Sequence, residues 1–501
     1  MKRIHILLIT AVLGLMAGQA AVAQSRDFKL GQWTEIHNSI IKELSRSYVD
    51  TLPIDKMMRK GVDAVLEQLD PYTVYIPEEE NEDLQMMLSK TYGGIGAIIH
   101  KKKDENVIIN EPYFGSPAHK NGLQCGDEII AIDGLPTKGL ETKESSDRMK
   151  GKPGTTVVFT VKKVRTGDTL AIPIVRERIH FPDIEYAGML DDTTGYIFQS
   201  GFTEGVAQQL KDKFLDLKSK GMKRLVLDLR GNGGGLMSEA VNIISLFVPK
   251  GSLAVSSKGK TPGSTHEYFT QTEPIDTQTP IIVMIDGGSA SASEIVSGGL
   301  QDLKRARIIG KTSFGKGLVQ SIRPLPYNGQ MKVTTAKYYT PSGRCVQGVG
   351  VKPDVEIDVP QYSRLVYSLV LGGVIDQYVI QFARNHDSIA HVEEYHFSDA
   401  DFEDFIDYAK TQDFDYRSSA KATFDKMKEE LEEDGLAGVM AEELAALEKA
   451  LEMDKERFIR LKKDEIIPFI EEEIATRYWF QEAGVKIRLR YDNQLMEALK
   501  K

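Results

Sequence analysis

The chain has 501 residues, of which 41% are hydrophobic and 27% are charged. At roughly 100 to 200 residues per domain this length predicts about three domains, and the ordinary composition excludes collagen-like and wholly disordered chains. A formal net charge of −10 argues against a general nucleic-acid-binding protein, because contacts with phosphates need a clustered basic face.

Residues 1–23 have the pattern of a secretory signal peptide. Lys2 and Arg3 precede an apolar run over 4–17, and the small-residue pattern AVA follows at 21–23. The alternative is an uncleaved membrane anchor, but a spanning helix needs about 20 apolar residues and this run is shorter. We therefore expect cleavage after the AVA pattern and export to the periplasm or the exterior, with no stable membrane span in the mature chain.

Export would place the chain where disulfides can form. The sequence contains only two cysteines, Cys125 and Cys345. Because the domain organisation set out below places them in different domains, we expect both to be free thiols.

Two regions with different patterns of apolar residues follow the expected signal peptide. Over 24–90, apolar residues such as Trp33, Ile36 and Ile40 recur three or four positions apart, which predicts an N-terminal helical region. Over 91–178, short β-branched runs are broken by glycine, with turn signals about every ten residues. This second region is predicted to be a compact β-rich module.

The segment 179–359 alternates apolar strands with helical stretches. A strand pattern at 224–229 leads through a glycine-rich turn into a helical pattern at 236–247, and a strand pattern at 281–286 leads into a second turn and helix. Two such units predict an α/β core with a mostly parallel sheet and its active loops at the carboxyl edge. The remaining residues, 360–501, predict a C-terminal helical appendage with solvated charged runs. The predicted fold class is therefore a multidomain α/β protein.

Three familiar enzymatic signatures fail in detail. The GKT sequence at 310–312 looks like the end of a phosphate-binding loop, but the glycine required at position 305 is replaced by Arg305. The HE pair at 266–267 lacks the second histidine of a zinc-protease motif. His266 is also the only histidine over 181–358, in a polar segment expected to be a mobile loop, which disfavours a Ser-His-Asp site. We expect neither a metal nor a cofactor.

The turn GGSASASE at 287–294 separates the second strand from its helix. Small residues leave room for a substrate backbone, and the N–H groups that begin a helix can stabilise an oxyanion, so a serine here is well placed as a nucleophile. The alternative is N-capping, since serine is a favoured cap and Glu294 follows Ser291 by three residues, as in a capping box. Taken alone, the turn favours capping.

A further pattern, SFGKGLVQ at 313–320, places Lys316 between two glycines at the start of an apolar strand. On a strand, side chains four residues apart share a face, so Lys316 and Gln320 should point the same way. A lysine acts as a general base only when neutral, which requires burial to lower its pKa from ~10.4. For an isolated lysine the simpler interpretation is a solvated side chain.

Taken together, these patterns resemble peptidase family S41, the Ser-Lys carboxy-terminal-processing or tail-specific proteases. The chain carries the family's DLRxNxGG block at 228–235, its SASASEI block at 289–295, its FGKGxVQ block at 314–320, and then TPSGR at 340–344 with a GVxPD-like ending at 350–354. The blocks occur in the order expected for the family and span the predicted α/β core.

The resemblance implies a role for each matching residue. The nucleophile, the general base and the residue that orients that base would be Ser291, Lys316 and Gln320. The oxyanion hole would combine the N–H of Ala292 with that of Gly235. Gly234 is the close rival of Gly235, because the turn is so rich in glycine.

The β-rich module resembles a PDZ domain, through the pattern GDxIxxIDG at 126–134. By this resemblance, a loop would hold the C-terminal carboxylate of a substrate with its backbone N–H groups, and the next strand would offer an edge for β-augmentation. That loop would consist of Tyr92, Gly93, Gly94, Ile95 and Gly96. A plain turn is the alternative interpretation of these residues.

The functional hypothesis is an exported serine endopeptidase that recognises C-terminal tails of proteins through a PDZ domain and hydrolyses peptide bonds with a Ser-Lys dyad. The alternative is a PDZ-bearing binding or scaffold protein with an inactive peptidase core. The expected partners are protein or peptide tails and not nucleic acid, with a homo-oligomer or an adaptor as further options. The substrates, the assembly state and the role of 360–501 stay open.

Overall fold

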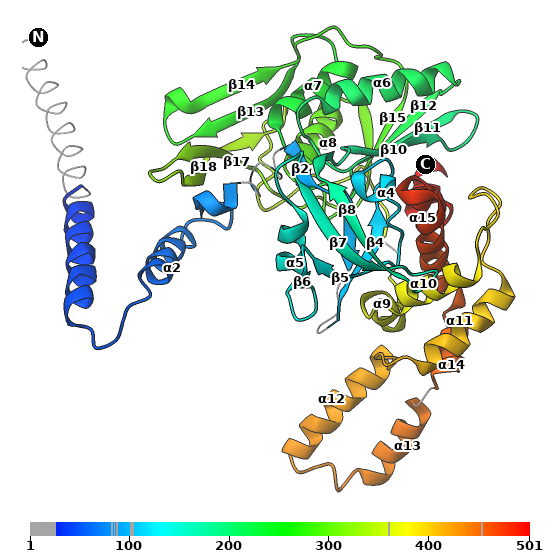
Figure 1. The fold of residues 1–501 in the computed structure, drawn as a ribbon. Helices are drawn as coiled ribbons and strands as arrows, with labels where there is room; N and C mark the ends of the chain where they lie inside the picture. The colour runs from blue at the N-terminus through cyan, green and yellow to red at the C-terminus, as the bar shows by residue number, and fades with distance from the viewer. Residues whose placement is uncertain are drawn as a thin grey trace, which may run out of the picture. The chain divides into compact units, whose positions relative to one another are not determined.

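The computed structural model describes residues 27–81, 84, 86, 89–100, 105–358, 361–451 and 454–500. The expected signal peptide over 1–23 lies outside the described residues. The chain divides between Tyr75 and Ile76 into two compact units, and Figure 1 traces the elements of both in chain order.

The N-terminal unit contains a helix over 27–47 and α2 (Ile54–Leu66), which confirms the predicted helical region. β1 (Val74–Ile76) lies at the boundary, and the 3₁₀ helix η1 (Glu78–Glu80) follows it. Trp33 and Val65, one from each helix, are both 67% exposed. The periodicity therefore predicts the helices correctly, although their apolar side chains are not buried.

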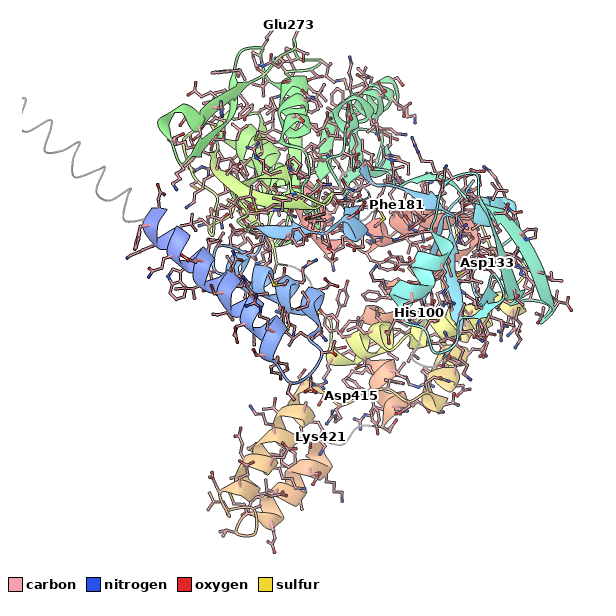
Figure 2. All side chains as sticks on the ribbon, turned by 60° about the vertical axis from the view of Figure 1, so that its left-hand side comes forward. His100, Asp133, Phe181, Glu273, Asp415 and Lys421 are labelled. Carbon is pink, nitrogen blue, oxygen red and sulfur yellow. The ribbon has the colours of Figure 1, made fainter. Side chains whose placement is uncertain are left out.

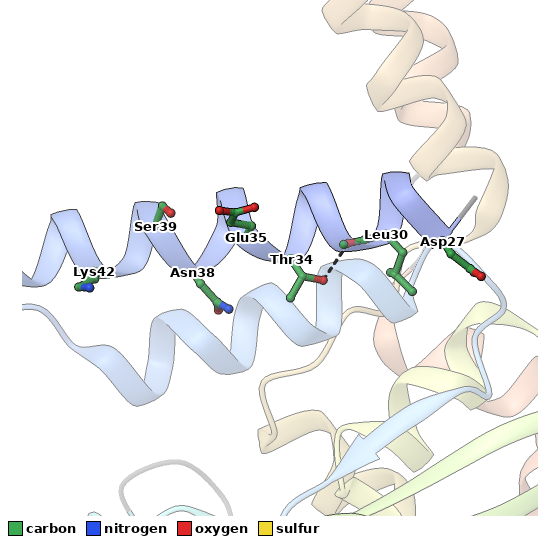
Figure 3. A pocket seen from close by; sticks show the side chains of 8 residues that line it. Asp27, Leu30, Thr34, Glu35, Asn38, Ser39 and Lys42 are labelled. Atoms are coloured by element: carbon green, nitrogen blue, oxygen red, sulfur yellow. Dashed lines mark hydrogen bonds between the residues drawn. The ribbon is translucent and has the colours of Figure 1, made fainter. Parts of the chain in front are cut away.

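A hollow of about 690 Å³ runs along the first helix. Figure 3 shows that its lining side chains, among them Leu30, Thr34 and Asn38, follow one another on that helix alone. Ligand sites are concave and enclose most of their ligand, which the surface of one helix cannot do. We therefore look for the functional site elsewhere.

The β-rich module is confirmed as an antiparallel sheet with the strand order β3-β4-β5-β7-β8, in which β6 pairs with β5, and a separate β2-β9 pair. Alternate strand residues such as Val107, Ile109 and Phe159 are fully buried, as in sheets with one face on a core. The elements are β2 (Thr91–Gly94), β3 (Ala97–His100), β4 (Val107–Pro112), α4 (Pro117–Lys120), β5 (Glu128–Ile132), β6 (Leu135–Pro136), α5 (Thr142–Met149), β7 (Thr156–Lys162), β8 (Thr169–Val175) and β9 (Glu177–His180).

The α/β core is built on a six-stranded sheet with the order β10-β11-β12-β15-β16-β19. Only the β10-β11 pair is antiparallel, so the sheet is mostly parallel as predicted. Its elements are β10 (Ile184–Met189), β11 (Thr194–Gln199), α6 (Val206–Ser219), β12 (Arg224–Asp228), α7 (Met237–Phe247), β15 (Ile281–Ile285), α8 (Ala292–Asp302), β16 (Ala306–Gly310) and β19 (Val355–Glu356).

A second, antiparallel sheet in the order β14-β13-β18-β17 was not foreseen from the sequence. Its strands are β13 (Leu253–Gly259), β14 (Thr265–Phe269), β17 (Leu318–Pro324) and β18 (Gln330–Tyr339), and the 3₁₀ helix η2 (Pro262–Ser264) joins the first two. The prediction of a mobile loop around His266 is wrong, because His266 lies in β14 opposite Ser257. β14 is almost entirely exposed, so it lacks the apolar alternation that identifies a strand.

The C-terminal region is helical, as predicted. Its helices are α9 (Arg364–Leu371), α10 (Val374–Asn385), α11 (Asp399–Thr411), α12 (Ser419–Glu433), α13 (Ala441–Leu451), α14 (Lys455–Leu461), α15 (Lys463–Arg490) and α16 (Asn493–Lys500). Lys421, labelled with Asp415 in Figure 2, joins α12 to α13 through Glu448 at 2.9 Å. No single helix among the described residues is long and apolar enough to cross a membrane; the pair α9 and α10, bent by 58°, meets the criteria of length and composition jointly.

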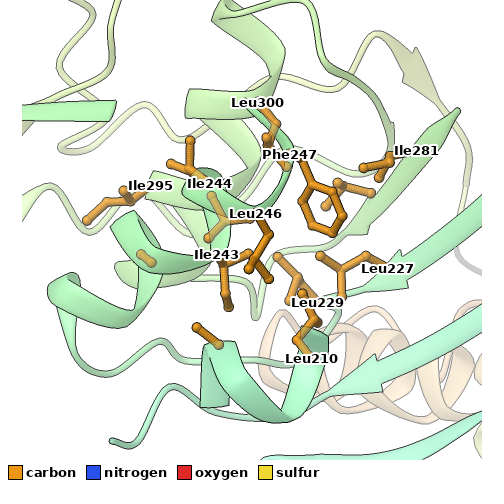
Figure 4. Packing of buried hydrophobic residues seen from close by; sticks show 14 of the residues in the cluster. Leu210, Leu227, Leu229, Ile243, Ile244, Leu246, Phe247, Ile281, Ile295 and Leu300 are labelled. Carbon is orange, nitrogen blue, oxygen red and sulfur yellow. The ribbon is translucent and has the colours of Figure 1, made fainter. Parts of the chain in front are cut away.

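The end of this helical region forms a layer of the α/β core. Successive residues of β12 point to opposite faces of the sheet: Leu225 and Leu227 pack into the cluster with α6, α7 and α8 (Figure 4), whereas Val226 packs with Leu489 and Leu495. These two leucines come from α15 and α16. The sheet is thus covered on both faces, as mostly parallel sheets require, and the second cover comes from the last helices of the chain.

Candidate active site

The turn between β15 and α8 carries three serines with different environments. Ser289 and Ser293 are fully buried, and their hydroxyls donate to the carbonyl oxygens of Leu229 and Asn232, at 2.7 and 2.8 Å. Ser291 instead lines a cavity of about 340 Å³. The outer two serines therefore fasten the turn, and Ser291 is the one placed to meet a substrate.

The backbone of Ser291 is in an unusual conformation, with φ 56° and ψ −112°. For a residue with a side chain such a conformation costs of order 1–3 kcal/mol and is found mainly at functional sites. Ser291 is also the N-cap of α8, and its N–H donates to the Glu294 carboxylate at 2.8 Å. Ser291 therefore makes the backbone contact that the capping interpretation expects. The same residue is also strained and lines the cavity, so capping does not exclude a role as nucleophile.

The glycine-rich turn after β12 lies directly against this serine. A Cβ atom at Gly234 would stand 2.8 Å from both the Ser291 Cβ and the Ala292 nitrogen, so only glycine fits there. The N–H of Gly234 donates to the Asn232 side chain at 2.9 Å. That N–H is therefore already engaged, and Gly235 stays the predicted second oxyanion donor.

Lys316 lines the same cavity as Ser291. Its pKa is lowered, first by burial and then by the positive charge of Lys332, while the negative charge of Glu294 acts in the opposite direction. Lys332, on β18, also lines the cavity, and the sequence offered no signal for it. Lys316 is consequently a partly buried amine that loses its proton more readily than a solvated lysine.

Gln320 also lines the cavity, although not for the reason given by the sequence. Lys316 lies two residues before β17 begins, and the pairing register of β17 shifts between Val319 and Gln320. Strict alternation along one strand therefore does not apply to the two residues. The Gln320 amide lies 3.5 Å from the Thr334 hydroxyl, at the outer limit of a hydrogen bond.

Glu294 connects the serine turn to the lysine loop. Its carboxylate is fully buried and accepts hydrogen bonds from the Ser313 hydroxyl at 2.6 Å and from the N–H groups of Gly315 and Lys316 at 2.7 and 2.9 Å, in addition to that of Ser291. The sequence presented Glu294 only as a capping-box residue. Its spacing in the turn gave no signal of the contacts with a loop about 20 residues further on.

Tyr338 provides a second link between the two segments. Its buried hydroxyl lies 2.8 Å from the Lys316 carbonyl oxygen and 3.1 Å from that of Ser291. Nothing in the sequence identified this residue. Glu294 and Tyr338 together fix the backbones that carry the two candidate reactive groups.

The rest of the cavity wall is largely apolar. The apolar side chains that line it belong to Phe202, Leu236, Met237, Ile295, Leu318, Val319 and Ile322. Apolar walls with a few convergent polar groups are typical of ligand pockets. This cavity can hold an apolar side chain next to the Ser291 hydroxyl.

The predicted carboxylate-binding residues lie at the start of the β-rich module. Tyr92, Gly93 and Gly94 belong to β2 and pair with β9, so only Ile95 and Gly96 form a loop before β3. Tyr92 stacks on Phe181, labelled in Figure 2, with ring centroids 5.5 Å apart. The expectation of a five-residue loop is therefore too long, since its first three residues continue a strand.

Among the described residues, no group of three or more His, Cys, Asp or Glu side chains is arranged to hold a metal ion. Cys125 and Cys345 are both free thiols, as predicted. The GKT sequence at 310–312 begins at the end of β16, and Lys311 pairs with Glu356 at 3.1 Å. These three features add no second reactive group to the cavity.

Comparison with known proteins identifies the family. The description "Peptidase family S41" matches residues 193–357, and the chain is 38% identical over 340 residues to the carboxy-terminal-processing protease of Bartonella bacilliformis, covering 66% of this chain and 77% of that protein. The chain belongs to the carboxy-terminal-processing proteases of peptidase family S41. It is a serine protease by family, as predicted.

Two further family models match the flanking regions. "PDZ domain" matches residues 84–162, and "Probable PDZ-protease, C-terminal helical domain" matches 365–501. The β-rich module is therefore a PDZ domain, as predicted. The exact domain boundaries given by the sequence stay predictions.

Other relatives are less similar. A "Probable CtpA-like serine protease" of Staphylococcus aureus is 34% identical over 332 residues, covering 65% of each chain. The solved structure of a photosystem II D1 C-terminal processing protease is 28% identical, with a TM-score of 0.38, and the match covers 63% of this chain and 86% of that one.

Proposed function

We propose that this chain is an exported serine endopeptidase that cleaves proteins after binding their C-terminal tails, with Ser291 as nucleophile and Lys316 as general base. The observation that carries the proposal is the shared cavity, which a strained serine and a lysine of lowered pKa both line. The family membership supports proteolysis, and the cavity supports this pair of residues.

The proposed reaction proceeds through an acyl-enzyme. The Ser291 hydroxyl attacks the scissile carbonyl carbon while its proton passes to the neutral Lys316 amine. The N–H groups of Ala292 and Gly235 stabilise the resulting oxyanion. The intermediate collapses, the C–N bond breaks, and the leaving amine takes the proton from Lys316. Water, deprotonated by the same amine, then hydrolyses the ester and restores the Ser291 hydroxyl.

In this scheme Gln320 orients the Lys316 amine from the same cavity wall. Ile95 and Gly96, with the strand residues Tyr92 to Gly94, bind the carboxylate of the tail. β3, which pairs with β4 at one end of its sheet, offers the edge to which the tail adds as a strand. An apolar residue of the tail suits the apolar cavity, because burying apolar surface contributes roughly 25 cal/mol of favourable free energy per Å².

Export and partners are part of the same proposal. The charged start, apolar run and AVA pattern over 1–23 support a signal peptide and a periplasmic or secreted location. Proteins and peptides with free C-terminal tails are the proposed substrates, and a homo-oligomer or an adaptor stays an option. The alternative, a tail-binding scaffold with an inactive core, predicts tail binding without cleavage.

The test is cleavage of a peptide with a free apolar C-terminus by the mature chain. Ser291→Ala should abolish cleavage, because the hydroxyl that forms the acyl-enzyme is lost. Ser289→Ala and Ser293→Ala are controls in the same turn, and both should keep most of the activity. Ser293→Ala loses one hydrogen bond and Ser289→Ala loses up to three, each worth about 0.5–1.5 kcal/mol of stability. Tail binding without cleavage by the wild type would favour the scaffold, and cleavage by Ser291→Ala would move the nucleophile to another residue.

A further inference from the structure

The C-terminal helical region reaches the active-site turn through one arginine. Arg230 follows β12 and belongs to the glycine-rich turn. Its guanidinium contacts both carboxylate oxygens of Asp228, with Nε 3.0 Å from each. On its other side it pairs with both carboxylate oxygens of Asp492 and donates to Gln494 at 2.9 Å. Two residues from the far end of the chain thus hold an arginine of the turn.

Asp492 occupies a well-defined position at the start of α16. Its carboxylate also accepts the Leu495 N–H at 2.8 Å, as the cap of a helix N-terminus does. α16 is in turn anchored on the sheet, because Leu495 is buried beside Val226 of β12. Asp492 therefore presents its carboxylate to Arg230 from a fixed support.

The turn beyond Arg230 is held by hydrogen bonds to the turn that carries Ser291. Gly231 donates its N–H to Asp286 at 2.9 Å, and the Asn232 carbonyl oxygen accepts the Ala290 N–H at 2.9 Å. Gly234, two residues later, packs against Ser291. A shift of Arg230 would therefore move the backbone that carries the proposed oxyanion donor.

The charges show that Asp492 is not needed merely to neutralise Arg230. The Arg230 side chain is 19% exposed and that of Asp228 only 2%, and without Asp492 the carboxylate of Asp228 would still balance the charge of Arg230. Loss of Asp492 would therefore leave no uncompensated buried charge, which is the usual cause of a large loss of stability. What would be lost is the second fixed point of a planar guanidinium, which normally sets its orientation.

We propose that Asp492 is a positioning residue for catalysis: through Arg230 it fixes the glycine-rich turn so that its N–H groups face the oxyanion formed at Ser291. This inference rests on the proposed function of Ser291. It gives the C-terminal helices a role in the chemistry of the protease core in addition to covering the sheet.

The first test is a kinetic comparison of Asp492→Asn with wild type. Asparagine still caps helices well, but it has one acceptor oxygen and no charge for Arg230. We expect kcat to fall about 10- to 100-fold, the scale of a small misplacement in an active site, with KM within about threefold. The affinity of a peptide aldehyde, which forms a tetrahedral adduct with the serine, should fall by the same factor as kcat/KM. Asp492→Glu, which restores the charge, should recover part of the loss.

Asp376→Asn is the matched control, because Asp376 on α10 pairs with the buried Arg477 of α15 at 3.2 Å, within the same helical region. It should leave kcat and aldehyde affinity near the wild-type values. Thermal unfolding of all variants reports stability separately. A proportional loss of kcat in both variants, or an effect of Asp492→Asn on KM alone, would overturn the positioning role.

Hydrogen exchange provides a readout that does not depend on catalysis. In Asp492→Asn the amides of residues 231–235 should exchange faster, while those of α7 stay unchanged. Unchanged exchange in the turn would overturn the inference even if activity fell. If the turn exchanged faster in Asp492→Asn but the wild-type protein cleaved no peptide, the proposed function would be contradicted. The structural link from Asp492 through Arg230 to the turn would still stand.

Discussion

The two glycine-containing turns that meet at the active site are held in different ways. The turn after β15 is fixed locally: Glu294, in the first turn of its own helix, accepts the N–H of Ser291 and those of the nearby lysine loop. The turn after β12 is fixed remotely, because Arg230 depends on Asp492, 262 residues further along the chain. Both are strand–turn–helix units in one sheet, yet only the second is joined by a side chain to the C-terminal helices.

The difference suggests a division of tasks. The locally fixed turn carries the candidate nucleophile and shares the buried Glu294 carboxylate with the loop of the proposed general base, so the backbones of these two groups are fixed together. The remotely fixed turn carries only backbone donors, whose alignment depends on the C-terminal helices. Variants in the turn after β15, or at the residues it contacts, should therefore change the rate of the chemical step and its pH dependence. Variants that act on the turn after β12 should change only the binding of the transition state.

After Ser291→Ala, the largest expected effect comes from Lys316→Arg, in the loop that Glu294 joins to the first turn. Arginine keeps the positive charge but cannot be deprotonated in proteins, so it cannot serve as a base. We expect a loss of about 10² to 10⁴ in kcat, the usual contribution of general acid–base catalysis, with Lys316→Ala equally inactive and both variants folded. Steady-state kinetics and thermal unfolding check this.

Wild-type activity should also rise with pH, since the neutral amine is the active form. Burial lowers the pKa of Lys316, so the midpoint should lie below the ~10.4 of a free lysine. Near-wild-type cleavage by Lys316→Arg would make Lys316 a structural or electrostatic residue and would break the proposed pairing with Ser291.

Glu294→Gln should have the next largest effect, because it removes the carboxylate that joins the serine turn to the lysine loop. Glutamine has one acceptor oxygen for several buried donors, and hydrogen bonds to charged groups contribute about 1.5–3 kcal/mol each. We expect kcat to fall about 10- to 100-fold and the melting temperature to fall as well. Because the charge of Glu294 raises the pKa of Lys316, the pH–activity midpoint of the remaining activity should move to lower pH.

The opposite direction, or no movement of the midpoint, would show that Glu294 acts on structure alone. Glu356→Gln is a suitable control: Glu356 pairs with Lys311, a lysine outside the cavity, and its loss should leave both kcat and the midpoint unchanged.

The sequence alone was sufficient to predict the parallel strands and helices of the α/β core and to identify the residues of its motifs. Alternating apolar strands and glycine-rich turns predicted β12, β15 and the helices after them, because these strands are buried on both faces and read as continuous apolar runs. It did not predict β13, β14, β17 and β18 as a sheet. The residues of β14, β17 and β18 are largely exposed or half-buried, so these strands lack a regular period.

The site was predictable only where a residue belongs to a recognisable block. Ser291, Lys316 and Gln320 could be found in this way and do line one cavity. Tyr338, Lys332 and Asp492 could not, because none of them belongs to such a block, and Asp492 contacts Arg230 and not the cavity. The same limit applies to the apolar face of the helix over 27–47, where periodicity predicted a helix but not its exposure.

A third glycine-containing turn, at the PDZ domain, extends the comparison to substrate binding. If its N–H groups bind a carboxylate, a peptide with a free apolar C-terminus should be cleaved about tenfold more efficiently than its amidated form, since hydrogen bonds to a charge contribute about 1.5–3 kcal/mol. A Cβ at Gly96, where φ is 73°, would stand 2.5 Å from the Ser116 Cβ. Gly96→Ala should therefore bring the ratio of kcat/KM values toward one.

Gly134→Ala is the matched control, because Gly134 has a similar φ of 78° in the same domain but open space at its Cβ position. It should keep the preference for the free carboxylate. Equal losses for both peptides in Gly96→Ala would mean that the PDZ domain acts on the core and does not read the carboxylate.

The smallest expected effect is that of Lys332→Met, which changes the charge near Lys316 and leaves both turns intact. Lys332 lines the cavity, and its charge disfavours the protonated form of Lys316. Removing that charge should raise the pKa of Lys316, so less of the neutral base is present at a given pH and the pH–activity midpoint moves to higher pH. Once the pH is high enough to deprotonate Lys316, the activity should return to the wild-type plateau.

The control is Lys337→Met, which makes the same change on an exposed side chain of the same strand. Its pH–activity midpoint should stay at the wild-type value. This control distinguishes the effect of a charge close to Lys316 from the effect of the protein's net charge. Lys332→Met and Glu294→Gln should move the midpoint in opposite directions. If both moved it the same way, the ionisation that controls activity would not be that of Lys316, and the general base would have to be another group in the cavity.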